Sequence, residues 1–106
     1  MSFYTKSQLA HWGEALAKKF LEEKGILIRE CNYRTVSGEI DLIGFKDDRF
    51  IFFEVKTRQS VNYGFPEEAV DLKKLEHIET VIWDFFESND IPDCDWQIDV
   101  ISIIRN

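Results

Sequence analysis

The stretch Gly38–Arg58, GEIDLIGFKDDRFIFFEVKTR, predicts the centre of the fold. Two largely apolar runs, Glu39–Phe45 and Phe50–Thr57, flank a charged tetrapeptide at 46–49. Apolar runs on either side of a short polar turn are typical of a β-hairpin. If the turn closes symmetrically around Asp47-Asp48, every facing pair in the hairpin is fixed, and the rest of the chain has to pack around it.

This register brings two carboxylates together. Asp41 is expected opposite Glu54, and Glu39 opposite Lys56. Directly opposed residues have Cβ atoms about 4.5–5.5 Å apart, so Asp41 and Glu54 could share one divalent cation. Facing carboxylates repel each other and lose solvation unless a cation or an ammonium lies between them. A metal ion together with Lys56 would resolve this conflict.

Both faces of the hairpin are largely apolar, which predicts a central hairpin covered on both sides. Alternation puts Glu39, Asp41 and Ile43 on one face and Ile40 and Leu42 on the other. A buried ion network that merely fixes the strand register is the structural alternative for the charged residues, but such networks are seldom net stabilising.

The remaining elements follow from periodicity. Helices are predicted over 5–24 and about 71–88, and further strands over 26–34 and 96–104. A strand, a helix and another strand indicate parallel pairing through a right-handed crossover. The order is αβββαβ, which predicts an α/β fold with a mixed four-stranded sheet and helices on both faces. The segment 59–66 reads as a loop and 67–70 as a short turn.

The two helices carry different stripes. In the first, Leu9, Trp12, Leu16 and Phe20 recur at three- and four-residue intervals and predict the core-facing side. Glu14 lies on a neighbouring stripe with Ala10, Ala17 and Leu21, where spacing alone favours an exposed glutamate paired with Lys18. The second helix has its stripe at Leu75, Ile78, Ile82 and Phe85, widened by Val81 and Phe86, and Asp71 is its expected N-cap.

Composition narrows the class of protein. The 106 residues, 44% of them apolar with nine Phe and three Trp, indicate one folded domain over residues 1–106. Two isolated Cys and two His argue against a zinc site or a disulfide framework. The start shows no secretory signal pattern, and no run of about 18 apolar residues occurs. We therefore expect a soluble cytoplasmic protein without a membrane partner.

The net charge of −7 is unfavourable for binding nucleic acid tightly. Residues 1–62 carry ten Lys/Arg and nine Asp/Glu, a net charge of +1, whereas residues 63–106 carry three and eleven, a net charge of −8. DNA would have to approach the N-terminal part, past Arg34, Lys56 and Arg58. Lys73 and Lys74 could be surface charges or could meet a phosphate. Low affinity for DNA is expected.

An Asp followed after twelve residues by Glu-Val-Lys on the adjacent strand suits phosphodiester hydrolysis. Asp41 and Glu54 would hold Mg²⁺, which prefers oxygen ligands, and the carbonyl of Val55 could add another. Lys56 would orient or deprotonate the attacking water, or neutralise charge on the phosphate. Glu14 could complete the acidic cluster.

Asp41…Glu54-Val55-Lys56 within αβββαβ resembles the PD-(D/E)XK nuclease superfamily, which includes restriction enzymes and Holliday-junction resolvases. More closely, the chain resembles the YraN family of small bacterial proteins with an endonuclease-like fold. The matching residues run through nearly the whole chain: Gly13-Glu14, Ala17, Gly25, Asn32-Tyr33-Arg34, Gly38–Ile43, Phe53–Arg58, Tyr63-Gly64, Pro66, Glu68-Ala69-Val70, Lys74 and Asp99-Val100.

The resemblance implies a restriction-endonuclease-like core and a metal-dependent nuclease using Mg²⁺, with Mn²⁺ as a substitute. It also implies a possible homodimer. Because the sequence shows no helix typical of groove readers, we expect action on branched or single-stranded DNA rather than on a base sequence. The resemblance also makes Glu14 a site residue beside Asp41, Glu54 and Lys56, with Arg34, Arg58 and Lys74 as nucleic-acid contacts.

Two departures from the family pattern remove positive charge. Glu76, His77 and Glu79 stand in a helix that is usually basic, and Gln97 replaces an arginine that often precedes the last strand's aspartate. The alternative function is a non-catalytic module that binds a basic protein partner through aromatic residues near Trp83, Phe85 or Trp96. Glu39 could form a salt bridge or bind the metal. His11, His77 and Asp99 are interpreted as structural or surface residues.

Overall fold

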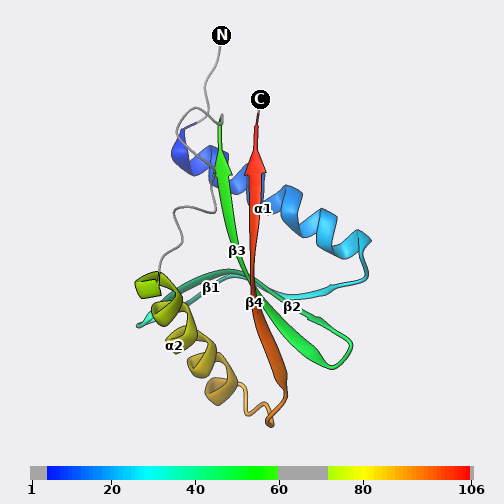
Figure 1. Cartoon of the computed structure of the whole chain (residues 1–106), viewed down its shortest axis with the longest axis vertical. Coiled ribbons are helices and arrows are strands. Elements are labelled where there is room, and N and C mark those ends of the chain that lie inside the picture. Colours follow the sequence, from blue (N-terminus) through cyan, green and yellow to red (C-terminus); the bar gives the residue numbers. More distant parts are fainter. Residues whose placement is uncertain (1–4, 60–71, 106) are drawn as a thin grey trace.

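The computed structural model describes residues 5–59 and 72–105, and their secondary structure follows the predicted order αβββαβ (Figure 1). The elements are α1 (Lys6–Glu23), β1 (Leu27–Thr35), β2 (Gly38–Lys46), β3 (Arg49–Arg58), α2 (Leu72–Ser88) and β4 (Asp95–Ile104). Thr5 caps α1 in a capping box with Gln8. The predicted turn at 67–70 and the predicted N-cap Asp71 lie outside the described residues. So does the predicted loop at 59–66, except for its first residue.

The four strands form one mixed sheet in the order β1-β2-β3-β4, with β3 and β4 parallel and the other pairs antiparallel. The hairpin register is as predicted from Lys46↔Arg49 to Leu42↔Phe53. Asp47 and Asp48 both have positive φ, 53° and 61°. Two such central residues make a type I′ turn, whose twist matches that of the flanking strands. The turn therefore fixes the register.

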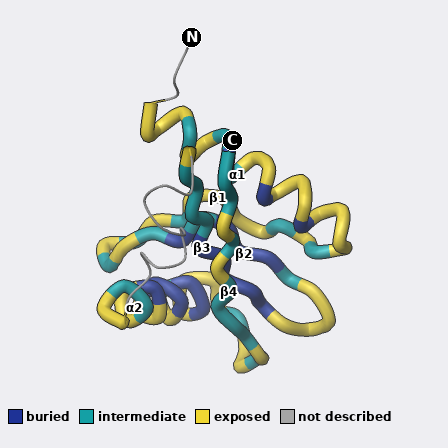
Figure 2. The backbone as a smooth tube through the Cα atoms, turned by 45° about the horizontal axis from the view of Figure 1, so that its top comes forward, coloured by how far each residue is buried: buried dark blue, intermediate teal, exposed yellow. Residues whose placement is uncertain are grey.

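One helix packs on each face of the sheet, as predicted. On one side Ile40, Ile43, Phe50 and Phe52 are buried against α2, which contributes Ile78, Val81, Ile82, Phe85 and Phe86. On the other side Leu42, Ile51 and Phe53 are buried against Ala17 and Leu21 of α1. The predicted stripe of the second helix is confirmed. Figure 2 shows the buried inner side of α2 and the largely exposed course of α1.

The core-facing side of α1 was predicted wrongly. Leu16 and Phe20 are 44% and 49% exposed, whereas Gly13, Ala17 and Leu21 are the buried residues of this helix. The reason is the close approach of α1 to β3. A Cβ built on Gly13 would collide with the side chain of Thr57. Only a residue without a side chain fits this contact, so the stripe that contains Gly13, Ala17 and Leu21 faces the sheet.

Beyond Leu42↔Phe53 the sheet forks. From there β2 stays paired with β1 as far as Thr35↔Gly38, while β3 stays paired with β4 as far as Arg58↔Ile104. In Figure 1 the β3–β4 pair runs upward and the β1–β2 pair crosses it at an angle. The fork opens the sheet between two central strands.

The fork also corrects two expectations. Ile40 packs with Ile43 in the α2-side cluster, three residues apart, so the strict alternation that put Ile40 with Leu42 is broken at Asp41. Glu39 does not face Lys56, because β2 has left β3 at this point. It faces Arg34 of β1 instead. Of the described helices, none combines the length and apolar character needed to cross a bilayer.

Candidate active site at the fork of the sheet

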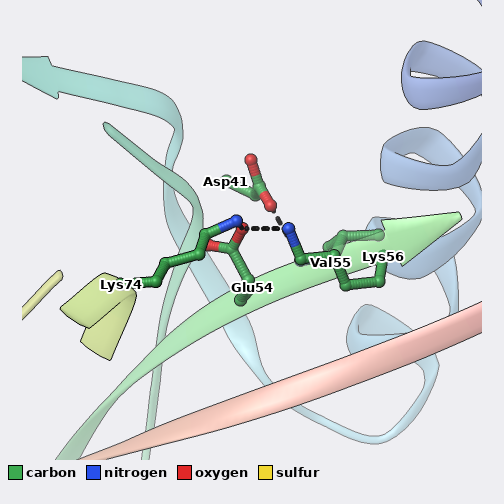
Figure 3. Close-up of polar contacts among 5 residues, drawn as sticks. All are labelled: Asp41, Glu54, Val55, Lys56 and Lys74. Atoms are coloured by element: carbon green, nitrogen blue, oxygen red, sulfur yellow. Dashed lines mark hydrogen bonds and ion pairs between the residues drawn. The ribbon is translucent and has the colours of Figure 1, made fainter. Parts of the chain in front are cut away.

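Asp41 lies where β2 leaves β3, and its side chain replaces the missing strand pairing. Its Oδ2 accepts a hydrogen bond from the backbone N–H of Val55 at 2.7 Å (Figure 3). The N–H and C=O of one strand residue point to the same side, so the Val55 carbonyl also faces the fork. The predicted Asp41–Glu54 proximity therefore holds, although backbone pairing stops one residue before it.

The surroundings of Asp41 disfavour the charged form of its carboxyl group. Burial raises its pKa to about 6, and the negative charges of Glu54, Glu14 and Glu39 add to this rise, while the hydrogen bond from Val55 opposes it. A carboxylate in this state gains from a nearby positive charge. The predicted conflict between facing carboxylates is therefore present in the folded chain.

Glu54 is a buried carboxylate, with 7% of the residue exposed. Its Oε1 lies 2.7 Å from Nζ of Lys74 and 3.3 Å from Nζ of Lys56. Figure 3 shows Lys74 reaching this oxygen from α2, while Glu54 and Lys56 both project from β3. Buried charges are expensive unless paired, and two ammonium groups from different elements provide that pairing.

The two lysines differ in their ionisation. Burial lowers the pKa of Lys56, and contact with the Lys74 ammonium lowers it further, despite the opposing effect of Glu54. Burial also acts to lower the pKa of Lys74, but hydrogen bonds with Glu54 and Lys56 raise it above its ordinary value. Lys74, the closer of the two to Glu54, is the firmly charged partner, and Lys56 is the more easily deprotonated one.

Glu14 and Glu39 act on the site through their negative charge. Glu14, on the partly buried flank of α1, adds to the negative field at Asp41, as Glu39 does. Glu39 forms an ion pair with Arg34, with Oε2 2.7 Å from Nε. The structure thus brings the charge of Glu14 within reach of Asp41, and it pairs Glu39 with Arg34 rather than with Lys56, the expected salt-bridge partner.

A cleft of about 400 Å³ opens onto these residues. It is lined by Ser37, Gly38, Glu39, Asp41, Glu54, Lys74, His77 and Ile78. His77 was not expected in the site. It lies three residues after Lys74 in α2, so both occupy one side of the helix, and that spacing was the signal available in the sequence.

The other predicted nucleic-acid contacts lie outside this cleft. Arg34 has a side chain 75% exposed but is held by Glu39. The carbonyl of Arg58 accepts a hydrogen bond from the N–H of Arg105 at 2.8 Å. Asp99 accepts hydrogen bonds from Gln97 on the same strand. A role for Arg34 and Arg58 in binding DNA stays a prediction.

The donor set fits a small hard cation. Within residues 5–59 and 72–105, no three His, Cys, Asp or Glu side chains gather in a way that could hold a metal. Mg²⁺, however, is commonly bound by one or two carboxylates and completes its shell with water and substrate phosphate. Asp41 and Glu54 supply two carboxylates, and burial together with the neighbouring carboxylates disfavours the charged form of Asp41, which a bound cation would favour.

These elements form a compact α/β fold, a mixed four-stranded sheet with two helices, which is consistent with a nuclease-like core. The family model described as "Uncharacterised protein family UPF0102" matches residues 13–103. The chain belongs to this family, which is the YraN family that the motifs resemble.

Relatives of the same description are similar over most of their length. The UPF0102 protein of Alkaliphilus oremlandii is 46% identical over 93 residues, which are 86% of this chain and 80% of the relative. The UPF0102 protein of Syntrophomonas wolfei is 40% identical over 92% of this chain and 84% of its own. That of Caldanaerobacter subterraneus is 36% identical over 100% of this chain and 87% of its own.

Proposed function

We propose that this protein is a metal-dependent nuclease that hydrolyses phosphodiester bonds in DNA. The observation that carries the proposal is the meeting of Asp41, Glu54 and Lys56 at the fork, next to an open cleft. A purely structural role explains this poorly, because a buried ion pair is rarely net stabilising and Asp41 is held with its pKa raised to about 6.

Each residue of the site has a distinct role in the proposed reaction. Asp41, Glu54 and the carbonyl of Val55 would hold a divalent cation. When bound, such a cation supplies a Lewis acid that activates water and stabilises charge on the phosphate oxygens. Lys56, whose pKa burial lowers, would orient the attacking water or take its proton. Glu14 would strengthen the negative field that attracts the cation.

Selection by DNA shape rather than by base sequence is part of the proposal. Base readout in duplex DNA requires a helix or a β-ribbon that enters a groove with several side chains at base edges. Here α2 is packed on the sheet and offers Lys74 and His77 to the cleft beside the acidic pair. Contacts of this kind suit the phosphate backbone of a branched or single-stranded substrate.

The test is a cleavage assay. Purified protein is incubated with four-way junction, flap, single-stranded and duplex DNA in Mg²⁺ and in Mn²⁺, at low salt where weak phosphate contacts persist. Cleavage is expected on at least one non-duplex substrate. Lys56→Ala and Glu54→Gln should each reduce the rate by about 10²–10³-fold, as expected for losing one group that stabilises the transition state.

Glu76→Gln is the matched control, because Glu76 is an exposed acid of α2 outside the cleft lining. It should cleave like the unaltered protein. Absence of cleavage on all four substrates with either metal would refute the proposal, provided circular dichroism shows a folded domain. Equal loss in Glu76→Gln would also count against the assigned roles.

A non-catalytic binding module is the second candidate, favoured by one observation. Trp83 is 51% exposed and lies beside Trp96, with ring centroids 6.0 Å apart. Exposed tryptophan is unusual and is enriched at interfaces. Phe85, predicted for the same patch, is buried with 2% exposed and does not contribute. This candidate would be favoured by a protein partner that binds the unaltered protein and Glu54→Gln equally well but does not bind Trp83→Ala.

A further inference from the structure

Glu54 has one oxygen shared by two ammonium groups. The Nζ of Lys74 is 2.7 Å from Oε1, and the Nζ of Lys56 is 3.3 Å from the same atom. Lys56 projects from the same strand as Glu54, two residues away, whereas Lys74 comes from the beginning of α2. The shorter contact is therefore made by the residue that is more distant in sequence, across the cleft from the sheet.

The two lysines also differ in how accessible they are. Lys74 is among the residues that line the cleft, together with Asp41 and Glu54, whereas Lys56 is not. The side chain of Lys74 is 35% exposed and that of Lys56 is 21% exposed. A lysine ammonium is a compact charge on a flexible four-carbon stem. Lys74 can consequently leave Glu54 without any movement of α2.

Charge balance indicates when it would leave. With all four groups ionised, Asp41, Glu54, Lys56 and Lys74 sum to zero. A divalent cation added to this set would leave a net charge of +2 and would place three cations, Lys56, Lys74 and the metal, at short range around Glu54, where they repel strongly. If Lys74 leaves, the two carboxylates, Lys56 and the metal sum to +1, which one phosphodiester of charge −1 neutralises.

We propose that Lys74 is a resident cation of this site. In the metal-free protein its ammonium occupies the position at Glu54 that a divalent cation takes, and it moves into the cleft when that cation binds, where it can pair with the substrate phosphate. The inference rests on the proposed function for its metal and its phosphate. It adds that the Lys74 side chain lowers the affinity of the site for the metal.

Calorimetric titration with MnCl₂ tests this in three proteins: unaltered, Lys74→Gln and Lys73→Gln. Lys73 is the exposed neighbour of Lys74 in α2, so the two variants lose the same charge one residue apart. Lys74→Gln is expected to bind Mn²⁺ about tenfold more tightly, since a charge-assisted hydrogen bond no longer has to be broken. Lys73→Gln should stay within about twofold.

Thermal unfolding gives a second readout that does not depend on cleavage. Without metal, Lys74→Gln should be less stable than Lys73→Gln, because Lys56 is then the one ammonium left at Glu54 among the described residues. When saturating Mn²⁺ is added, the melting temperature of Lys74→Gln should rise more than the melting temperatures of the unaltered protein and Lys73→Gln. If Lys74→Gln does not fold, Lys74→Arg is used, whose planar guanidinium should hold Glu54 more firmly and should therefore weaken Mn²⁺ binding.

Equal Mn²⁺ affinity in the three proteins would overturn this inference while leaving the proposed metal-dependent nuclease intact. Weaker binding by Lys74→Gln would overturn it as well, because it would make Lys74 a helper of the metal rather than its competitor. No binding in any of the proteins, Lys74→Gln included, would end both proposals together.

Discussion

Asp41 performs two tasks that conflict. Its carboxylate satisfies the Val55 N–H that the fork leaves without a strand partner, and that bond needs only an acceptor oxygen. Its negative charge, in contrast, is opposed by burial and by Glu54, Glu14 and Glu39. An amide could accept the hydrogen bond without the charge, so closing the fork does not require the charge.

Asp41→Asn is therefore expected to stabilise the protein in a pH-dependent way. The pKa of Asp41 is about 6 in the folded chain against an ordinary 3.8, so the favourable protonated form is fully present below pH 3.8 and is lost as the pH rises through 6. Above that, removing the charge should raise the free energy of unfolding by about 1–2 kcal/mol, allowing for screening by solvent.

Urea unfolding at pH 4 and pH 8 checks this, with the difference between variant and unaltered protein appearing at pH 8 and vanishing near pH 4. Asp93→Asn is the control, because Asp93 is an exposed acid in the loop before β4. A similar pH-dependent gain in both variants would show that the effect comes from net charge rather than from the fork.

At the scale of elements, the contact between α1 and β3 decides where Glu14 lies. Gly13 is buried against Thr57, whose hydroxyl is buried with no hydrogen-bond partner among the described residues. The helix approaches the strand this closely because position 13 has no side chain. Glu14, the next residue, is thereby held near enough for its charge to act on Asp41.

Gly13→Ala separates this contact from helix propensity. Propensity alone predicts a gain of about 1 kcal/mol, because alanine is the better helix former. The collision with Thr57 predicts a loss of about 1–3 kcal/mol, and we expect the loss to prevail. Chemical denaturation measures it, and Gly13→Ala with Thr57→Ala, which removes the hydroxyl and methyl groups that the new Cβ would meet, should recover part of it. A variant as stable as the unaltered protein would contradict the close packing.

The elements show which parts of the fold a sequence can predict. The stripe of α2 was predictable because its large apolar residues lie on one side and polar residues on the other. In α1 two neighbouring stripes were apolar or small, and the choice between them depended on Thr57, some forty residues away. The hairpin register was predictable only while the strands stay paired, and the fork depends on the neighbours that β1 and β4 provide.

The same limit applies to the site. Asp41, Glu54 and Lys56 were predictable because a tight turn brings them together across one hairpin. Lys74 was expected to contact phosphate, and His77 was set aside, since nothing local places α2 over the acidic pair. That placement comes from the packing of Ile78 and Val81 on the sheet, which brings the start of the helix to the cleft.

At the scale of the whole molecule, charge sets the expected affinity for DNA. The chain carries a net charge of −7, and few cations are available near the cleft. We predict binding to single-stranded DNA with a shallow salt dependence, a slope of log K against log salt no steeper than about −3, as for four phosphate contacts or fewer. Fluorescence anisotropy between low and moderate salt measures it.

Lys74→Gln should make that slope shallower by about one phosphate contact, whereas Lys73→Gln, with the same loss of charge, should change it less. A slope steeper than about −5 would require an extended basic surface. It would show that DNA reaches the protein by a route other than the cleft beside Glu54.

The hydrogen bond that closes the fork also gives the molecule an internal probe. The amide proton of Val55 points at a carboxylate oxygen 2.7 Å from its nitrogen, and short bonds to charged acceptors are strong and sensitive to that charge. A change at Asp41, whether protonation, an arriving cation or a nearby phosphate, would therefore shift one backbone resonance and alter its rate of solvent exchange. The occupancy of the site could be followed in the intact chain by a single nuclear magnetic resonance signal, without a substrate.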